Sequence, residues 1–238
     1  GDPFKDINWK ATARKRKHLV NQKERESVSD ITLVLDAREQ SAFGTVEDNP
    51  HVYLSRVAGT LANFFLKRRD SVGIVIYGDK VTNVKKGGGQ KQFYEILTAV
   101  SSVNPKGSIP LGGIVEEVLP YMPRKSPVVI LSPLDEDDSL RQAVSTMMVL
   151  EFDVMVISPD SIEFELMAKE KERKKIEKGE KKKKIFDKSE EVDKIAFDVL
   201  KLERDIVLQE MRSYGARVVS WNPRTPMMQM MLEINNTT

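Results

Sequence analysis

The sequence predicts an α/β fold: a doubly wound, mostly parallel sheet of six strands with one antiparallel edge strand and helices on both faces. Five short apolar runs rich in β-branched residues are bounded by turn-forming residues, and they lie at 31–36, 72–77, 127–132, 153–158 and 217–221. The runs are continuous rather than alternating, which is typical of strands buried on both faces. Helical periodicity fills the gaps between them, so right-handed crossovers are expected to align the strands in parallel.

The sixth strand is expected beside the second one. The run at 81–84 follows Tyr77 across Gly78, Asp79 and Lys80. Three turn-forming or polar residues between two strand-like runs indicate a hairpin. This run is therefore predicted to be the antiparallel edge strand.

Apolar stripes at helical spacing predict the helices. The expected helices lie near 52–69, 90–103, 111–122, 139–148 and 192–206. The stripe of the last one consists of Val192, Ile195, Val199, Leu202 and Ile206, which share one face of a helix. Gly215 is suited to cap the end of that helix, and Thr225-Pro226 is suited to begin a short final one.

Composition excludes several function classes. With 238 residues, of which 40% are hydrophobic, the chain is long enough for a full core. The absence of cysteine excludes disulfides and thiolate chemistry in this sequence, and two histidines argue against a histidine-based metal site. No apolar run reaches the length of about 18 residues that a membrane-spanning helix needs. The polar start is no secretory signal, and because it falls inside a motif, we expect the chain to be a fragment.

The charge is concentrated in one insertion. The whole chain has a net charge of +2, but from Lys169 to Lys188 there are 11 Lys and Arg against 5 Asp and Glu. This stretch belongs to an insertion at about 161–188 that follows the fifth strand run. It is predicted either to be a solvated, partly helical arm or to bind an anionic surface, either lipid or nucleic acid.

One acidic residue and one acidic cluster are expected at the carboxyl edge of the sheet, where open α/β sheets bind ligands. Asp36 ends the first, central strand run. Asp135, Asp137 and Asp138 follow the run at 127–132. The second group is interpreted either as capping the helix near 139–148, because acids favour helix N-termini, or as an acidic patch for a basic partner.

The N-terminal residues resemble the signature of a known family. They comprise Asp2, Ile7, Trp9-Lys10-Ala11 and Ala13-Arg14. Together with the stretch from Arg68 to Val81, they resemble the membrane-associated "domain of unknown function 58" family. The resemblance implies a motif segment at 1–29, with Asp2, Trp9, Lys10 and Arg14 as its marks, and a von Willebrand factor A-like (vWA-like) domain at 30–238.

The resemblance also implies a metal-ion-dependent adhesion site, and here the sequence departs from the pattern. Such a site takes Asp-x-Ser-x-Ser after the first strand, a Thr from a later loop and an Asp after the fourth strand. Asp36 matches, but Arg38 and Gln40 stand at the two serine positions. Ser108 is the candidate for the Thr, and Ser132-Pro133-Leu134 replaces the usual Thr-Asp-Gly.

Too few oxygen ligands remain for the octahedral shell of Mg²⁺ at Asp36, so no cofactor is expected. Arg38 is expected either to take over the charge-balancing role of the cation or to point to solvent. Glu39 is a further candidate to replace a lost ligand.

These observations predict a non-enzymatic protein-interaction module with no small-molecule substrate. The resemblance implies the cytoplasmic part of a membrane-anchored protein that works with a MoxR-type AAA+ ATPase. The expected binding rim consists of Asp36, Arg38, Glu39, Ser108, Asp135, Asp137 and Asp138. Two alternatives remain open: a metal-dependent phosphohydrolase, and nucleic-acid or anionic-membrane binding through the Lys-rich arm.

Overall fold

The computed structural model describes residues 29–45, 47–107, 125–134, 138–178 and 188–230, together with Val115, Leu119 and Met122. Within 172–194 it describes the backbone alone. The motif segment with Asp2, Trp9, Lys10 and Arg14 lies outside the described residues. So do Ser108, Asp135, Asp137 and most of the helix expected at 111–122.

The sheet has the predicted architecture. Its strands are β1 (Asp30–Asp36), β2 (Ser71–Tyr77), β3 (Val81–Gly87), β4 (Pro127–Leu131), β5 (Asp153–Pro159) and β6 (Arg217–Trp221). They lie in the order β3-β2-β1-β4-β5-β6, and every neighbouring pair is parallel except β2 and β3. The doubly wound, mostly parallel sheet with one antiparallel edge strand is therefore confirmed.

The strand register brings the carboxyl ends of the central strands together. Asp36 at the end of β1 pairs with Tyr77 at the end of β2. On the other side Leu35 pairs with Leu131 of β4, so Ser132 follows directly beyond that pair. β1 is buried from Ile31 to Asp36, because it is central and covered on both faces. Asp36 therefore ends in the interior of the protein.

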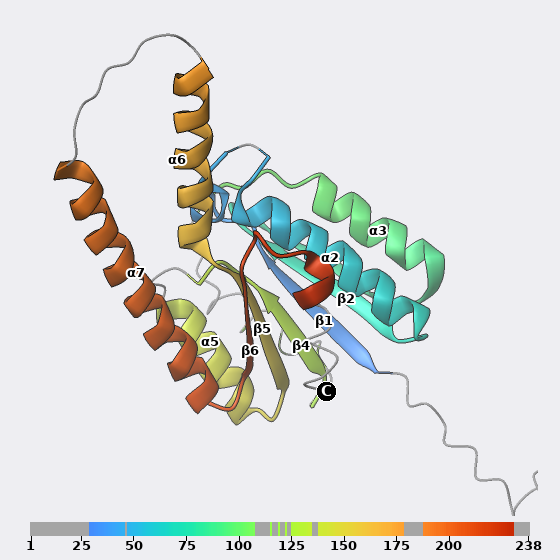
Figure 1. Cartoon of the computed structure of the whole chain (residues 1–238). Helices are drawn as coiled ribbons and strands as arrows, with labels where there is room; N and C mark the ends of the chain where they lie inside the picture. Colours follow the sequence, from blue (N-terminus) through green and yellow to red (C-terminus); the bar gives the residue numbers. More distant parts are fainter. Residues whose placement is uncertain are drawn as a thin grey trace, which may run out of the picture.

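The helices cover the sheet on both faces (Figure 1). The helices are η2 (Glu39–Ala42, a 3-10 turn), α2 (Pro50–Lys67), α3 (Gly89–Ser101), α5 (Asp138–Val149), α6 (Ser161–Lys178) and α7 (Lys188–Ser213). One core cluster joins β1 to α2 and α3, and the other joins β4 and β5 to α5 and α7. Residues 227–230 form the short final helical turn.

Local sequence signals account for the ends of two helices. Asn49 accepts a hydrogen bond from the backbone of Val52 at 2.9 Å, and Pro50 opens α2 with its φ already suited to a helix. Gly215 has φ of +95°, and its N–H donates to the carbonyl of Arg212 at the end of α7. Glycine adopts this left-handed conformation without strain, so the predicted cap is confirmed.

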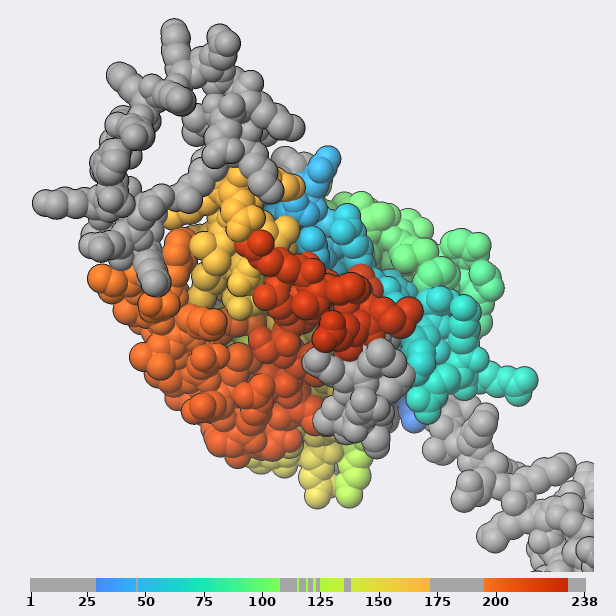
Figure 2. All heavy atoms as spheres, viewed as in Figure 1, coloured from blue at the N-terminus to red at the C-terminus, as the bar shows by residue number. Residues whose placement is uncertain are grey.

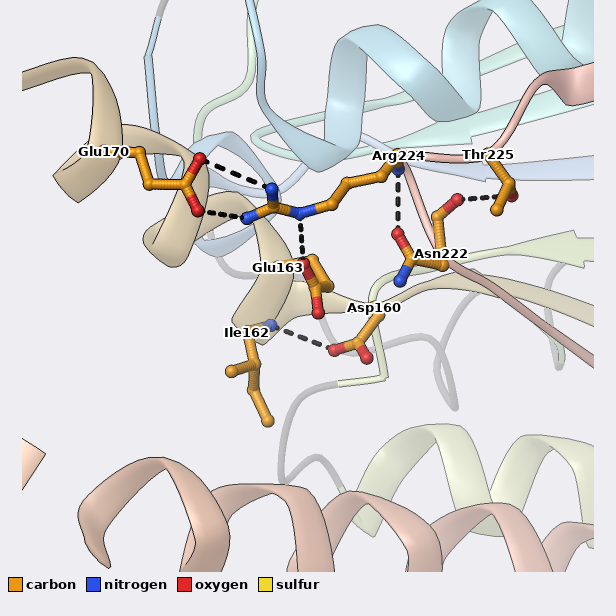
Figure 3. A network of polar contacts seen from close by, with 7 residues as sticks. All are labelled: Asp160, Ile162, Glu163, Glu170, Asn222, Arg224 and Thr225. Carbon is orange, nitrogen blue, oxygen red and sulfur yellow. Dashed lines mark hydrogen bonds and ion pairs between the residues drawn. The ribbon is translucent and has the colours of Figure 1, made fainter. Parts of the chain in front are cut away.

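The first part of the charged insertion is a helix attached to the body of the domain. Figure 3 shows Arg224, from the turn after β6, reaching across to α6. Its guanidinium donates to Glu170 at 2.9 and 3.3 Å and to Glu163 at 2.6 Å. Lys171 also pairs with Asp48, and Lys169 lies 4.6 Å from the centre of the Phe197 ring. Several charges of α6 thus have partners within the chain.

No helix in the described part of the chain combines the length and the apolar character needed to cross a bilayer.

Candidate functional site: a buried ion pair at the carboxyl edge

The carboxylate of Asp36 is the centre of the site, and it is fully buried. Arg38, two residues later, folds back and clamps it: Nε donates to Oδ1 at 3.0 Å, and Nη2 donates to Oδ2 at 2.7 Å. The backbone N–H of Arg38 also donates to Oδ1 at 3.0 Å. From the neighbouring strand, the hydroxyl of Ser132 donates to Oδ2 at 2.9 Å. Each carboxylate oxygen therefore accepts two hydrogen bonds.

Arg38 is itself 3% exposed, so the expectation that it points to solvent is wrong. Its guanidinium lies 5.2 Å from the centre of the Tyr77 ring, within cation–π range. Planar, bidentate pairing suits arginine better than lysine, because the guanidinium matches the carboxylate in geometry. The side chain of Arg38 instead pairs with the carboxylate of Asp36, in agreement with the alternative expectation that it balances that charge.

Two further titratable groups surround the pair. Burial, and next the negative charge of Asp36, raise the pKa of Tyr77 well above its usual 10. The Tyr77 hydroxyl has no hydrogen-bond partner of regular geometry within the described residues. Burial also lowers the pKa of His51, against the opposing influence of Asp36, whose carbonyl lies 3.3 Å from Nδ1. Burial therefore favours the neutral forms of both Tyr77 and His51.

This arrangement does not fit the metal that an adhesion site would hold. An ionised carboxylate offers about four lone-pair positions, and Arg38 and Ser132 use four of them on Asp36. The guanidinium stands where a cation would need to approach. Among the described residues, no cluster of three or more His, Asp or Glu side chains is placed to hold a metal ion.

A second loop is packed against the site through backbone contacts. Lys106 donates its N–H to the carbonyl of Ala37 at 3.0 Å, and Glu39 donates to the carbonyl of Gly107 at 3.2 Å. Gly107 has φ of +78°, and a Cβ there would lie 2.5 Å from the Cα of Asp79. Glycine is therefore required for this close approach.

The structure divides the predicted binding rim into two layers. Glu39, which opens η2, and Asp138, which opens α5, are exposed. Asp36 and Arg38 lie in the interior. The prediction that these two residues contact a partner directly is therefore corrected. Their strand-end position was predicted, but their burial follows from the loops and helices that close over the edge.

Sequence reasoning missed Arg204 of α7. It is 6% exposed and crosses the carboxyl ends of the neighbouring strands. It donates to the carbonyl of Pro133 at 3.0 Å and to the carbonyl and hydroxyl of Ser158 at 3.2 and 3.1 Å, and it reaches the hydroxyl of Ser220 at 3.3 Å. The available signal was an arginine one turn before Val207 and Leu208, on the face of α7 that is buried.

Sheet, helices and edge together define a vWA-like α/β domain with an internal ion pair at the carboxyl end of its central strand. The chain belongs to the family described as "Protein of unknown function DUF58", which matches residues 1–166. This confirms the resemblance of the N-terminal signature. No functionally curated protein matches the sequence.

Solved structures resemble the chain at low similarity. The SpRpn10 VWA domain is 13% identical with a TM-score of 0.49, and the match covers 89% of this chain and 95% of that one. BatB from Bacteroides thetaiotaomicron is 11% identical with a TM-score of 0.42, covering 55% of this chain and 66% of that one. Manganese-loaded TRAP from Plasmodium vivax is 15% identical with a TM-score of 0.41, covering 55% and 57%.

Proposed function

We propose that this domain is a non-enzymatic protein-interaction module whose carboxyl edge binds a basic surface of its partner without a metal ion. The partner that the family resemblance suggests is a MoxR-type AAA+ ATPase. The same resemblance suggests that the domain is the cytoplasmic part of a membrane-anchored protein. Both statements rest on the resemblance alone.

The observation that carries the proposal is the clamp of Arg38 on Asp36. In a metal-dependent adhesion site, a cation at this position attracts an acidic group of the partner. Here a guanidinium takes the place of the cation. Its charge is neutralised by Asp36, and both groups are buried. The exposed members of the predicted rim are acidic: they are Glu39 and Asp138, and Asp138 also pairs with Arg141 of the same helix at 3.3 Å. An acidic rim favours a basic partner surface, through complementary charge.

The test is binding of a purified MoxR-type ATPase to the wild-type chain and to the double variant Glu39→Lys/Asp138→Lys. We expect the variant to bind about tenfold or more weakly, with an unchanged melting temperature, because both side chains are exposed. Chelation by EDTA is expected to leave wild-type binding unchanged. Loss of binding in EDTA would contradict the metal-free mode.

A matched control carries the same number of charge reversals far from the edge. Glu151 lies just before β5, at the amino edge of the sheet, and Glu95 lies on α3. Glu151→Lys/Glu95→Lys is expected to bind the ATPase like wild type. Equal weakening in both double variants would mean that net charge decides binding and that the edge does not.

The metal itself is tested by calorimetric titration of the chain with Mg²⁺ and Mn²⁺. We expect no binding heat at millimolar metal, because Asp36 has no lone pair to offer. Measurable heat together with turnover of a phosphoester would contradict the proposed interaction module and indicate a metal-dependent phosphohydrolase.

A further inference from the structure

α7 has two apolar faces, and the domain uses only one of them. Val207, Leu208 and Met211 are buried in the core cluster with α5 and β5. Four residues of the apolar stripe that predicted the helix, from Ile195 onward, are exposed instead. Ile195 and Leu202 are 64% and 63% exposed, and Val199 and Ile206 are each 49% exposed. In Figure 2, α7 (orange) lies at the margin of the molecule.

The spacing of the exposed stripe is that of a helix-pairing seam. Its four residues are separated by four, three and four positions, which is the a/d repeat of a coiled coil. At 1.5 Å per residue the seam from Ile195 to Ile206 is about 16 Å long. A single solvated helix gains nothing from such a seam, because four large apolar side chains remain in water. The seam is complete only when a second helix covers it.

The charges beside the seam identify the chemistry of that helix. In the heptad that places Ile195 and Leu202 at d, the flanking e and g positions hold Glu203, Asp198 and Asp205. None of these three acids makes an ion pair with a described residue. All three lie where a paired helix presents its own flanking residues. A partner with lysine or arginine at those positions would neutralise them.

We propose that the outer face of α7 is a docking site for a basic amphipathic helix, one with an apolar seam flanked by Lys and Arg. A second copy of this chain is the less suitable occupant. Pairing two α7 seams sets Asp198, Glu203 and Asp205 against acids of the other copy in either orientation, and like charges there destabilise the pair. This site is separate from the carboxyl edge and independent of the function proposed for that edge.

The test uses synthetic peptides of about four heptads with leucine at a and d. One peptide carries lysine at e and g, and the other carries glutamate. We expect the full chain to bind the lysine peptide in a salt-sensitive manner and to ignore the glutamate peptide. Ile195→Ser/Leu202→Ser is expected to weaken binding of the lysine peptide about tenfold or more, since buried apolar anchors dominate such contacts.

Two control variants decide between the seam and general attraction. Val149→Ser/Met228→Ser removes apolar side chains elsewhere that are even more exposed, and it is expected to bind the lysine peptide like wild type. Asp198→Lys/Asp205→Lys is expected to switch the preference to the glutamate peptide. Equal binding of the lysine peptide to the seam variant and wild type would overturn the proposal. So would a lowered melting temperature of the seam variant, or a wild-type dimer in sedimentation that this variant abolishes.

Discussion

Two regions of this domain depart from the rule of apolar inside and polar outside, in opposite directions. At the carboxyl edge, Asp36 and Arg38 place two full charges in the interior. On α7, Ile195 and Leu202 place large apolar side chains in water. The buried pair is closed, because every lone pair of Asp36 has a donor. The stripe is open. The difference separates a contact completed within the chain from one that needs a partner.

The largest expected effect comes from opening the closed region. Arg38→Met leaves Asp36 buried without its counter-charge, and we expect the free energy of unfolding to fall by about 3–5 kcal/mol. Denaturation in urea measures it. As a control, Arg217→Met removes a partly exposed partner of Asp153 and should cost less than about 1 kcal/mol. A loss of the same size in both variants would mean that the clamp is no stronger than a surface pair.

The next effect concerns Arg204, the buried charge on the inner face of α7. Arg204→Met removes the donors to Pro133 and Ser158, leaving buried carbonyls unsatisfied. We expect a loss of about 2–3 kcal/mol in urea unfolding. Lys201→Met, one turn earlier on the exposed side, is the control and should change little. An unchanged stability in Arg204→Met would show that the carbonyls gain other partners.

A smaller, pH-dependent effect is expected at His51 beside the ion pair. Burial lowers its pKa in the folded protein, so the unfolded chain takes up a proton at a higher pH than the folded one. The unfolded state then binds more protons as the pH falls below about 6.5, and the free energy of unfolding falls with it. His51→Asn should flatten that part of the pH profile, measured by thermal melts. A profile of unchanged slope would assign the acid sensitivity to other groups.

The smallest effect is expected at the open stripe. Leu202→Ala should change the free energy of unfolding by less than about 0.5 kcal/mol, because the side chain is already in water. Met211→Ala, on the buried face of the same helix, should cost about 2–5 kcal/mol. Urea unfolding of the two variants measures how differently the two faces of α7 are used. A similar loss of unfolding free energy in both variants would mean that another part of the chain covers the stripe.

Much of the fold was accessible to sequence reasoning, because each element carried its own local signal. The strand runs at 31–36 and 72–77 are buried on both faces. A continuous run of β-branched apolar residues is typical of such strands, so the sequence indicated their burial. The hairpin to β3 followed from the three residues between the runs. Gly215 marked the end of α7, through its left-handed backbone.

The site was accessible only in part. The end of β1 predicted the position of Asp36, and the missing serines predicted that a metal site would be incomplete. The direction of Arg38 was left open, since spacing alone does not say whether a side chain folds back or extends. Arg204 gave only the indirect signal of its place one turn before Val207 and Leu208, because an arginine within an amphipathic helix usually lies on the solvent side.

The sequence by itself determined the elements: six strands, their helical crossovers and the residues standing at the strand ends. The tertiary structure alone decided which of those residues are in water. Periodicity reports that one face of a helix is apolar, yet it does not report which neighbour covers that face. For α7 the periodicity was correct about the helix, but the face covered by the sheet is the one with Val207 and Met211. Burial depends on residues far apart in the chain, and local patterns do not contain it.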